Sequence, residues 1–175
     1  FMWQKTTRES KKYQLRGEIL SFIPVEKNVE VMLVTITNTG RMAQTVTPTA
    51  AIPLYGRSAD NIRDHRHVTS LLHRIETTDT GFCDTDIVFD ERGHQVNHMT
   101  YYCVGWSGNG EKPVDFYPTA EDFVGEGGNF EDNAIVKKAE GVKAGTRIEG
   151  LEAVGGLHFS EVTLEPEEEC SYLIF

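Results

Sequence analysis

The sequence predicts an all-β fold, in which antiparallel strands form a sandwich of two sheets with at most one or two short helices. Most segments alternate apolar and polar residues with a period of two, the pattern of a strand with one buried face. Gly, Pro, Asn and Asp residues interrupt these segments at short intervals, as is typical of tight turns. Segments with helical spacing are few and short, which argues against strands that alternate with helices in a parallel sheet.

Two strands are predicted in the first part of the chain. Residues 13–19 alternate in this way, and the segment ends at Ile23-Pro24. The run Val29–Ile36 is rich in β-branched residues and apolar on both faces, so this strand is predicted to be central in its sheet. It ends at Asn38-Thr39-Gly40, a turn sequence followed by Thr45-Val46-Thr47 and an Ala-Ile-Pro run.

Further strands and two turns are predicted in the rest of the chain. The turns are Asp90-Glu91-Arg92-Gly93, which is hairpin-like, and Glu165-Pro166-Glu167. Each turn separates two alternating segments. These four strands are Phe82–Phe89, Val96–Trp106, Gly155–Val162 and Cys170–Phe175.

Two segments have helical spacing. In Asp60–Ile75 the apolar residues recur as on a helix, with Asp60 available as N-cap, but Val68–Leu72 fits a strand equally well, so both readings stay open. Thr119–Val124 is predicted to form one short helix, since Thr119 can cap it and Asp122 follows at the third position.

Length and charge narrow the classes of function. A chain of 175 residues is one domain, and its 39% hydrophobic and 25% charged residues are ordinary for a globular protein. The formal charge of −10 argues against a nucleic-acid partner and against an anionic membrane surface, since both attract basic proteins. No segment reads as a bilayer span or a secretory signal. Three cysteines without close spacing predict neither a disulfide framework nor a zinc site, so the reducing cytoplasm is the expected location.

Both ends of the sequence are apolar, at Phe1-Met2-Trp3 and at Tyr172-Leu173-Ile174-Phe175. Natural domains usually end in solvated residues. We therefore expect residues 1–175 to be a single β-sandwich domain taken from a larger protein. We also expect both apolar runs to be exposed here, as part of a surface that a partner domain covers.

Familiar catalytic constellations are not predicted. His65 and His67 are two residues apart and His94 and His98 four apart, but neither pair has a third ligand at a known spacing, so no metal site is predicted. Pairs of nearby acidic residues are too common in an acidic chain to indicate a glycosidase. The glycine-rich run 125–128 lacks the Lys-Ser/Thr ending of a phosphate loop and is predicted to be a surface loop, so no cofactor is expected.

The densest polar cluster lies at residues 57–67, where three arginines, acidic residues, an asparagine and two histidines occur within eleven positions. Such side chains can hydrogen-bond sugar hydroxyls in bidentate fashion, or they can form an internal salt-bridge network that holds a long loop to the sandwich. The candidate substrate-binding residues are Arg57, Asp60, Asn61, Arg63 and His65. No residue is predicted to be catalytic.

Several segments together resemble the N-terminal β-sandwich domain of the inverting glycoside phosphorylases of glycoside hydrolase family 94, formerly glycosyltransferase family 36. Val29–Asn38 is similar to that family's strand ending in Thr-Asn, and Pro118–Gly128, with its sequence Phe-Val-Gly-Glu-Gly-Gly, resembles a family loop. Gly150 to Glu168 resembles the family's closing pair of strands. Ile52–Ile75 is more similar to the branch acting on β-1,2-linked glucooligosaccharides than to the cellobiose phosphorylase-like branch. The resemblance covers about residues 10–175.

The resemblance implies a super-sandwich of two large antiparallel sheets, related to the galactose mutarotase fold. It implies that chemistry belongs to a separate (α/α)6 barrel of the same parent chain, which supplies the general acid and the phosphate site. There orthophosphate attacks the anomeric carbon of a β-glucooligosaccharide with inversion and releases glucose 1-phosphate. No catalytic residue carries over to this sequence, and the sandwich is expected to pack on the barrel and wall its cleft.

Two other hypotheses remain open. The first is a stand-alone carbohydrate-binding module that holds glucan on exposed aromatic side chains, for which the candidates are Trp3, Trp106, Tyr101 and Tyr102. The second is a mutarotase-like epimerase that uses a histidine and a carboxylate as acid and base, a hypothesis that depends on analogy of fold.

Overall fold

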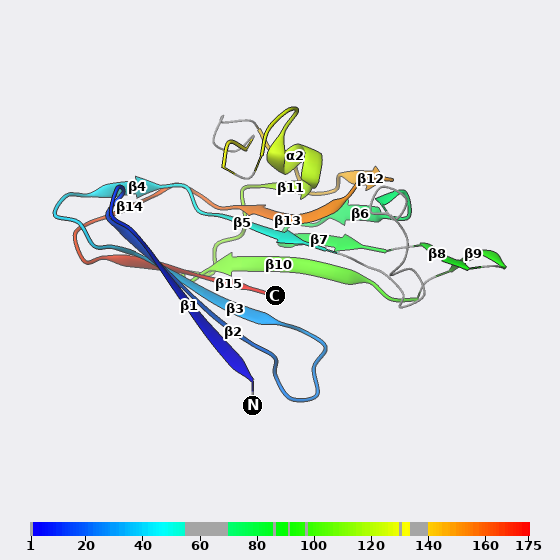
Figure 1. The fold of residues 1–175 in the computed structure, drawn as a ribbon, viewed down its shortest axis with the longest axis horizontal. Coiled ribbons are helices and arrows are strands. Elements are labelled where there is room, and N and C mark those ends of the chain that lie inside the picture. Colours follow the sequence, from blue (N-terminus) through cyan, green and yellow to red (C-terminus); the bar gives the residue numbers. More distant parts are fainter. Residues whose placement is uncertain are drawn as a thin grey trace. The chain divides into compact units, whose positions relative to one another are not determined.

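The computed structural model describes residues 2–54, 70–85, 87–90, 92–96, 98–129, 131–133 and 140–175 (Figure 1). In these residues the paired strands are antiparallel and one short helix is present, as predicted. The chain divides into two compact units. The first unit comprises Phe1–Pro48, Val104–Pro113 and Phe159–Phe175, and the second comprises Thr49–Cys103 and Val114–His158.

In the first unit, the strand predicted to be central has a neighbouring strand on each side. The strand order is β1 (Trp3–Ser10), β2 (Leu15–Phe22), β3 (Val31–Asn38), β15 (Glu169–Ile174) and β10 (Tyr101–Ser107). The registers place Leu20 opposite Leu33, Leu33 opposite Leu173, and Leu173 opposite Trp106. One rung of the sheet is therefore apolar across four strands, although Leu33 in this rung is 40% exposed.

Asn38 ends β3 and fixes the turn that the sequence predicted there. Its carbonyl Oδ1 accepts a hydrogen bond from the Gly40 amide at 2.9 Å, and its Nδ2 donates to the backbone oxygens of Met42 and Leu164, each at 2.8 Å. The side chain is fully buried, so each of these bonds replaces one that water would otherwise make. The bond to Leu164 also ties this turn to β14 (Val162–Leu164), which pairs with β4 (Gln44–Val46).

The predicted exposure of the last apolar run is wrong. Tyr172 and Ile174 are only 5% and 4% exposed, because β15 lies between β3 and β10 and is covered by neighbours. Near the other end Met2 and Trp3 are 83% and 64% exposed, as expected, and Phe1 lies outside the described residues. The strand β1, with seven of its eight side chains exposed, was not anticipated, since its sequence does not alternate in hydrophobicity.

The second unit contains a three-stranded sheet in the order β11 (Asp115–Thr119), β13 (Ala153–His158) and β5 (Thr49–Pro53). It also contains β6 (Arg74–Thr77), which pairs with both β7 (Gly81–Asp84) and β12 (Arg147–Glu149).

Strand β13 is the centre of this three-stranded sheet and carries two adjacent glycines. A Cβ on Gly155 would lie 2.7 Å from Cys103 Sγ, and a Cβ on Gly156 would lie 2.3 Å from the Tyr117 carbonyl oxygen. Both distances are shorter than any real contact, so only glycine permits this close approach.

The predicted short helix is α2 (Ala120–Val124), drawn beside β11 in Figure 1. Its N-cap is Thr119, whose Oγ1 accepts a hydrogen bond from the Asp122 amide at 3.0 Å and donates one to Asp122 Oδ2 at 2.7 Å. Phe123 is buried against the Tyr117 ring, with the ring centroids 6.4 Å apart and the planes nearly perpendicular. Burial of one such side chain stabilises a fold by about 1.5–3 kcal/mol.

Two predicted strands are each divided in the structure. The segment Phe82–Phe89 contains the end of β7 and the start of β8 (Ile87–Asp90), and Val96–Trp106 contains the end of β9 (Gly93–Val96) and most of β10. The strands β8 and β9 pair with each other as the predicted hairpin, whereas β7 pairs with β6. The chain thus changes partner between Asp84 and Ile87, and the alternation of hydrophobicity does not record that change.

The predicted strand Gly155–Val162 is divided for the same reason. Its first part belongs to β13, which pairs with β11 and β5, and Val162 begins β14, which pairs with β4. In the ambiguous segment Asp60–Ile75, Ser70 is helical and Leu71 and Leu72 form a turn, so the described part of Val68–Leu72 is not a strand, and β6 begins only at Arg74.

Candidate functional site

The five candidate substrate-binding residues lie outside the described residues: Arg57, Asp60, Asn61, Arg63 and His65. What the structure describes is the chain on either side of them. Before this segment, β5 pairs with β13 and the Leu54 amide donates to the Ala153 carbonyl oxygen at 3.1 Å. After it, residues 71–74 enter β6 through a buried polar network.

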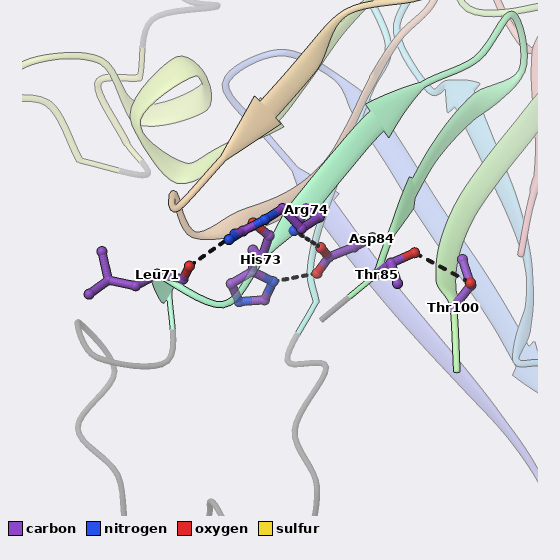
Figure 2. A network of polar contacts seen from close by, with 6 residues as sticks. All are labelled: Leu71, His73, Arg74, Asp84, Thr85 and Thr100. Carbon is purple, nitrogen blue, oxygen red and sulfur yellow. Dashed lines mark hydrogen bonds and ion pairs between the residues drawn. The ribbon is translucent and has the colours of Figure 1, made fainter. Parts of the chain in front are cut away.

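His73 and Asp84 are the centre of this network (Figure 2). His73 Nδ1 is paired with Asp84 Oδ2, and the other carboxylate oxygen, Oδ1, accepts a hydrogen bond from the Arg74 amide at 3.0 Å. Asp84 is fully buried and His73 is 5% exposed. Since Asp84 ends β7 and His73 precedes β6, the pair joins the two strands at the point where the undescribed segment ends.

The Arg74 side chain also stabilises the start of β6, through contacts with Leu71, His73 and Glu149. Its Nη1 donates to the backbone oxygens of Leu71 at 3.0 Å and His73 at 2.7 Å, and its Nε lies 3.5 Å from Glu149 Oε2. The His73 carbonyl oxygen also accepts from the Gly150 amide at 3.1 Å. A planar guanidinium with several donors suits this kind of multiple anchoring.

Thr85 follows Asp84 in the chain. It is within hydrogen-bond distance of Thr100, with 3.4 Å between their Oγ1 atoms (Figure 2). Taken together, these contacts make the network an anchor for the chain. A catalytic acid–base pair must reach its substrate, whereas the carboxylate and the ring here are both shielded from solvent.

A second histidine–carboxylate pair is more accessible. His158 Nδ1 lies 2.5 Å from Asp115 Oδ1, and Lys143 Nζ lies 3.9 Å from Asp115 Oδ2. The side chains of His158 and Asp115 are 19% and 12% exposed. A carboxylate that holds one ring nitrogen orients the imidazole and leaves the other nitrogen for a further contact.

The glycine-rich run after α2 is a tight surface loop, as predicted. Gly125 ends the helix with φ 79°, and Gly127 also has a positive φ of 67°. A Cβ on Gly128 would lie 2.1 Å from the Val124 carbonyl oxygen. The amides of Gly125 and Gly128 donate within the loop, to Glu121 and Gly125, so they are not directed at a phosphate.

The thiols are poorly suited to nucleophilic catalysis. Burial raises the pKa of Cys103 to about 12, and burial is also the main cause of the raised pKa values of Cys83 and Cys170. The reactive form of cysteine is the thiolate, which these environments disfavour. In the described parts of the chain no three His, Cys, Asp or Glu side chains are grouped so that they could hold a metal ion.

Fold and site together define an antiparallel β-sandwich domain whose polar clusters mainly hold its own loops. The chain matches the family model described as glycosyl hydrolase 94, supersandwich domain, over residues 1–175, and it therefore belongs to this family. It is a domain of the glycoside phosphorylase family that the sequence resembles, and the branch within that family is not resolved. A comparison with curated proteins gives no match. Among the described residues no helix is long and apolar enough to cross a membrane.

Proposed function

We propose that this chain is the non-catalytic N-terminal supersandwich domain of an inverting β-glucoside or β-glucan phosphorylase. The observation that carries the proposal is the match to the family's supersandwich domain along all 175 residues. The polar network at His73 and Asp84 supports it, because this network anchors a loop and does not present an open acid–base pair.

In this proposal the parent enzyme's (α/α)6 barrel provides the general acid and the phosphate site, and the sandwich packs on the barrel and walls its cleft. The segment of the chain between β5 and β6 is the part of the sandwich proposed to contact the β-glucooligosaccharide, through Arg57, Asp60, Asn61, Arg63 and His65. The location proposed for the enzyme is the cytoplasm, in keeping with three cysteines that are all free thiols.

The first test is phosphorolysis by the chain alone. Incubated with β-linked glucooligosaccharides and orthophosphate, it should release no glucose 1-phosphate above a buffer blank, since the proposed acid and phosphate site are on the barrel. Turnover by the chain alone would refute the proposal.

The second test examines the candidate substrate-binding residues in the parent enzyme. Asn61→Ala and Arg63→Ala should raise the KM for the oligosaccharide and leave the KM for phosphate unchanged, since uniform binding contacts act on KM. The matched control is Lys12→Ala, an exposed residue of the first unit, which should change neither constant. Equal effects of all three variants would show that the loop makes no substrate contact.

The binding-module hypothesis receives limited support from the aromatic residues. Trp3 is 64% and Tyr102 46% exposed, but they belong to different units, and Trp106 packs edge-on against Phe175 at 5.9 Å. Quenching of tryptophan fluorescence by glucooligosaccharides would favour this hypothesis.

The epimerase hypothesis is favoured by one observation, the accessible pair of His158 and Asp115. Polarimetry on freshly dissolved α-glucose tests it directly. Accelerated mutarotation that is lost in His158→Ala would make this the better proposal.

A further inference from the structure

The first unit contains a hollow of about 460 Å³ that the family relationship does not explain. Three segments enclose it: the loop 107–112 after β10, residues 159–162 before β14, and residues 168–172 at the start of β15. Pockets of about 300–1,000 Å³ are the usual size for small-molecule sites.

The wall formed by the 107–112 loop is held in place without a ligand. Ser107 and Glu111 are joined by two hydrogen bonds, from the Ser107 amide to the Glu111 carbonyl oxygen at 2.9 Å and from the Glu111 amide to Ser107 Oγ at 3.1 Å. The Gly108 amide donates to the Ser171 carbonyl oxygen at 2.7 Å, and a Cβ on Gly108 would lie 2.2 Å from Ser171 Oγ. The loop therefore lies directly against β15, in an arrangement that requires glycine.

The turn at residues 165–168, which precedes β15, is also held by hydrogen bonds. The Glu168 amide donates to the Glu165 carbonyl oxygen at 3.0 Å, and Glu168 Oε2 accepts from the Glu165 amide at 2.8 Å. Glu167 completes this turn with φ 67°. Because both walls are preformed, little conformational entropy would be lost when a ligand binds.

The floor of the hollow is aromatic. The rings of Phe159 and Tyr172 pack at a centroid distance of 4.7 Å, and Leu164 lies beside them in the lining. The three side chains are buried, so their positions are set by the core of the unit. Because Phe159 and Tyr172 are only 3% and 5% exposed and their ring planes differ by 49°, they close the base of the hollow and leave little ring surface for a ligand.

The rim is polar and acidic. Ser107, Asn109, Ser160 and Ser171 supply hydroxyl and amide groups, and the charged lining residues are Glu111, Glu161, Glu168, Glu169 and Lys112. Four carboxylates against one ammonium give a formal charge of −3. This charge disfavours phosphates, nucleotides and sugar acids. The polar rim also disfavours a wholly apolar ligand, because its groups would lose their water without new partners.

We propose that this hollow binds a neutral saccharide, a mono- or disaccharide, whose hydroxyl groups are hydrogen-bonded to the polar rim above the closed base of Phe159 and Tyr172. Carboxylates and amides are the acceptors and donors that vicinal hydroxyl groups need, and a neutral sugar brings no charge to be repelled. The proposal does not depend on the role of the chain in a phosphorylase, so each can fail without the other.

The test is titration of the 175-residue chain, labelled with ¹⁵N, with cellobiose and sophorose. Amide signals of Gly108, Asn109, Ser160 and Ser171 should shift and saturate with dissociation constants in the millimolar range. Glucose 1-phosphate and glucuronic acid should bind more weakly by about tenfold or more, as expected for an acidic rim. Shifts spread evenly over the surface, no saturation, or equal binding of the anionic sugars would overturn the proposal.

Three single substitutions test whether the sugar binds in this hollow. Ser160→Trp places a large side chain at an exposed rim position and should abolish saturation, and Asn109→Ala should weaken binding by about three- to tenfold. Asn28→Ala is the matched control, because Asn28 is exposed in the same unit and does not line the hollow. An unchanged thermal transition shows that each variant is folded. Binding that survives Ser160→Trp in a folded protein would place the sugar elsewhere and overturn the proposal.

Discussion

The buried carboxylate of Asp84 is expected to contribute strongly to the stability of the second unit. Its oxygens bind both the His73 ring and the Arg74 amide in a site that solvent does not reach. Asp84→Ala leaves both groups buried without an acceptor, and we expect it to lower the free energy of unfolding by about 3–5 kcal/mol. Asp84→Asn keeps one carbonyl oxygen and should cost clearly less.

The measurement is urea-induced unfolding of the 175-residue chain. Glu30→Ala, at an exposed position, is the control and should change stability by no more than about 0.5 kcal/mol. If Asp84→Ala were as mild as this control, the network would not be the anchor described above.

The pairing of His73 with Asp84 could not be predicted from the sequence. The two residues are eleven positions apart, and they meet because the register of β6 and β7 places Ile75 opposite Asp84. A slip of one residue in that register would direct Asp84 to the other face of the sheet. The sequence marked the nearby polar residues 57–67 instead, and the binding role of Arg57 and its neighbours stays a prediction because they lie outside the described residues.

Among the elements, α2 is the one whose position the sequence predicted closely. Its N-cap signal is local, since Thr119 and Asp122 are three residues apart and bond to each other. Thr119→Ala removes the cap from a fully buried position, and we expect a loss of about 0.5–2 kcal/mol in the free energy of unfolding. Thr119→Ser keeps the hydroxyl and should recover most of this loss. Equal losses in the two variants would assign the effect to the methyl group and its packing.

Strands were predicted as well as their local signals allowed. The run Val29–Ile36 predicted that β3 is an interior strand, and β3 does lie between β2 and β15, although Leu33 on one of its faces is 40% exposed. Strand ends were less well predicted. β7 and β8 were predicted as one strand, because they differ in the strands with which they pair and the local sequence does not record which strand pairs with which. The burial of β15 was missed for the same reason: β3 and β10, far away in sequence, cover it.

At the scale of the whole molecule, the order of weak motifs along the chain was more informative than any single residue. No one segment identifies the family, but the strand at 29–38, the loop at 118–128 and the closing segment from 150 occur in the family's order, and the family match extends over all 175 positions. Fold class followed from the same evidence. The linkage specificity does not follow from the order of these motifs, because it depends on individual contacts to the sugar.

Five thiol and phenol groups of the molecule have raised pKa values in the folded state. Burial is the main cause of a raised pKa in each of the following described side chains: Cys83, Cys103, Cys170, Tyr117 and Tyr172. Each is neutral when protonated, so the folded state keeps protons that the unfolded state releases above its ordinary values of 9.0 for cysteine and 10.0 for tyrosine. The slope of stability against pH is then negative, and each such group contributes at most about 1.4 kcal/mol per pH unit. Stability from these groups is complete below pH 9 and is lost as the pH rises above it.

We therefore predict that the free energy of unfolding falls steeply between about pH 9 and pH 11, as thiolates and phenolates form in the unfolded chain. The loss adds to charge repulsion in a protein that already carries a formal charge of −10. Tyr172→Phe removes one of the buried phenols and should make the slope above pH 10 shallower, whatever it does to stability at neutral pH. Tyr102→Phe, at a position that is 46% exposed, is the matched control for removal of a phenol hydroxyl. Urea unfolding at a series of pH values measures the slopes, and identical slopes for Tyr172→Phe and Tyr102→Phe would show that burial of Tyr172 does not control the alkaline limit of the fold.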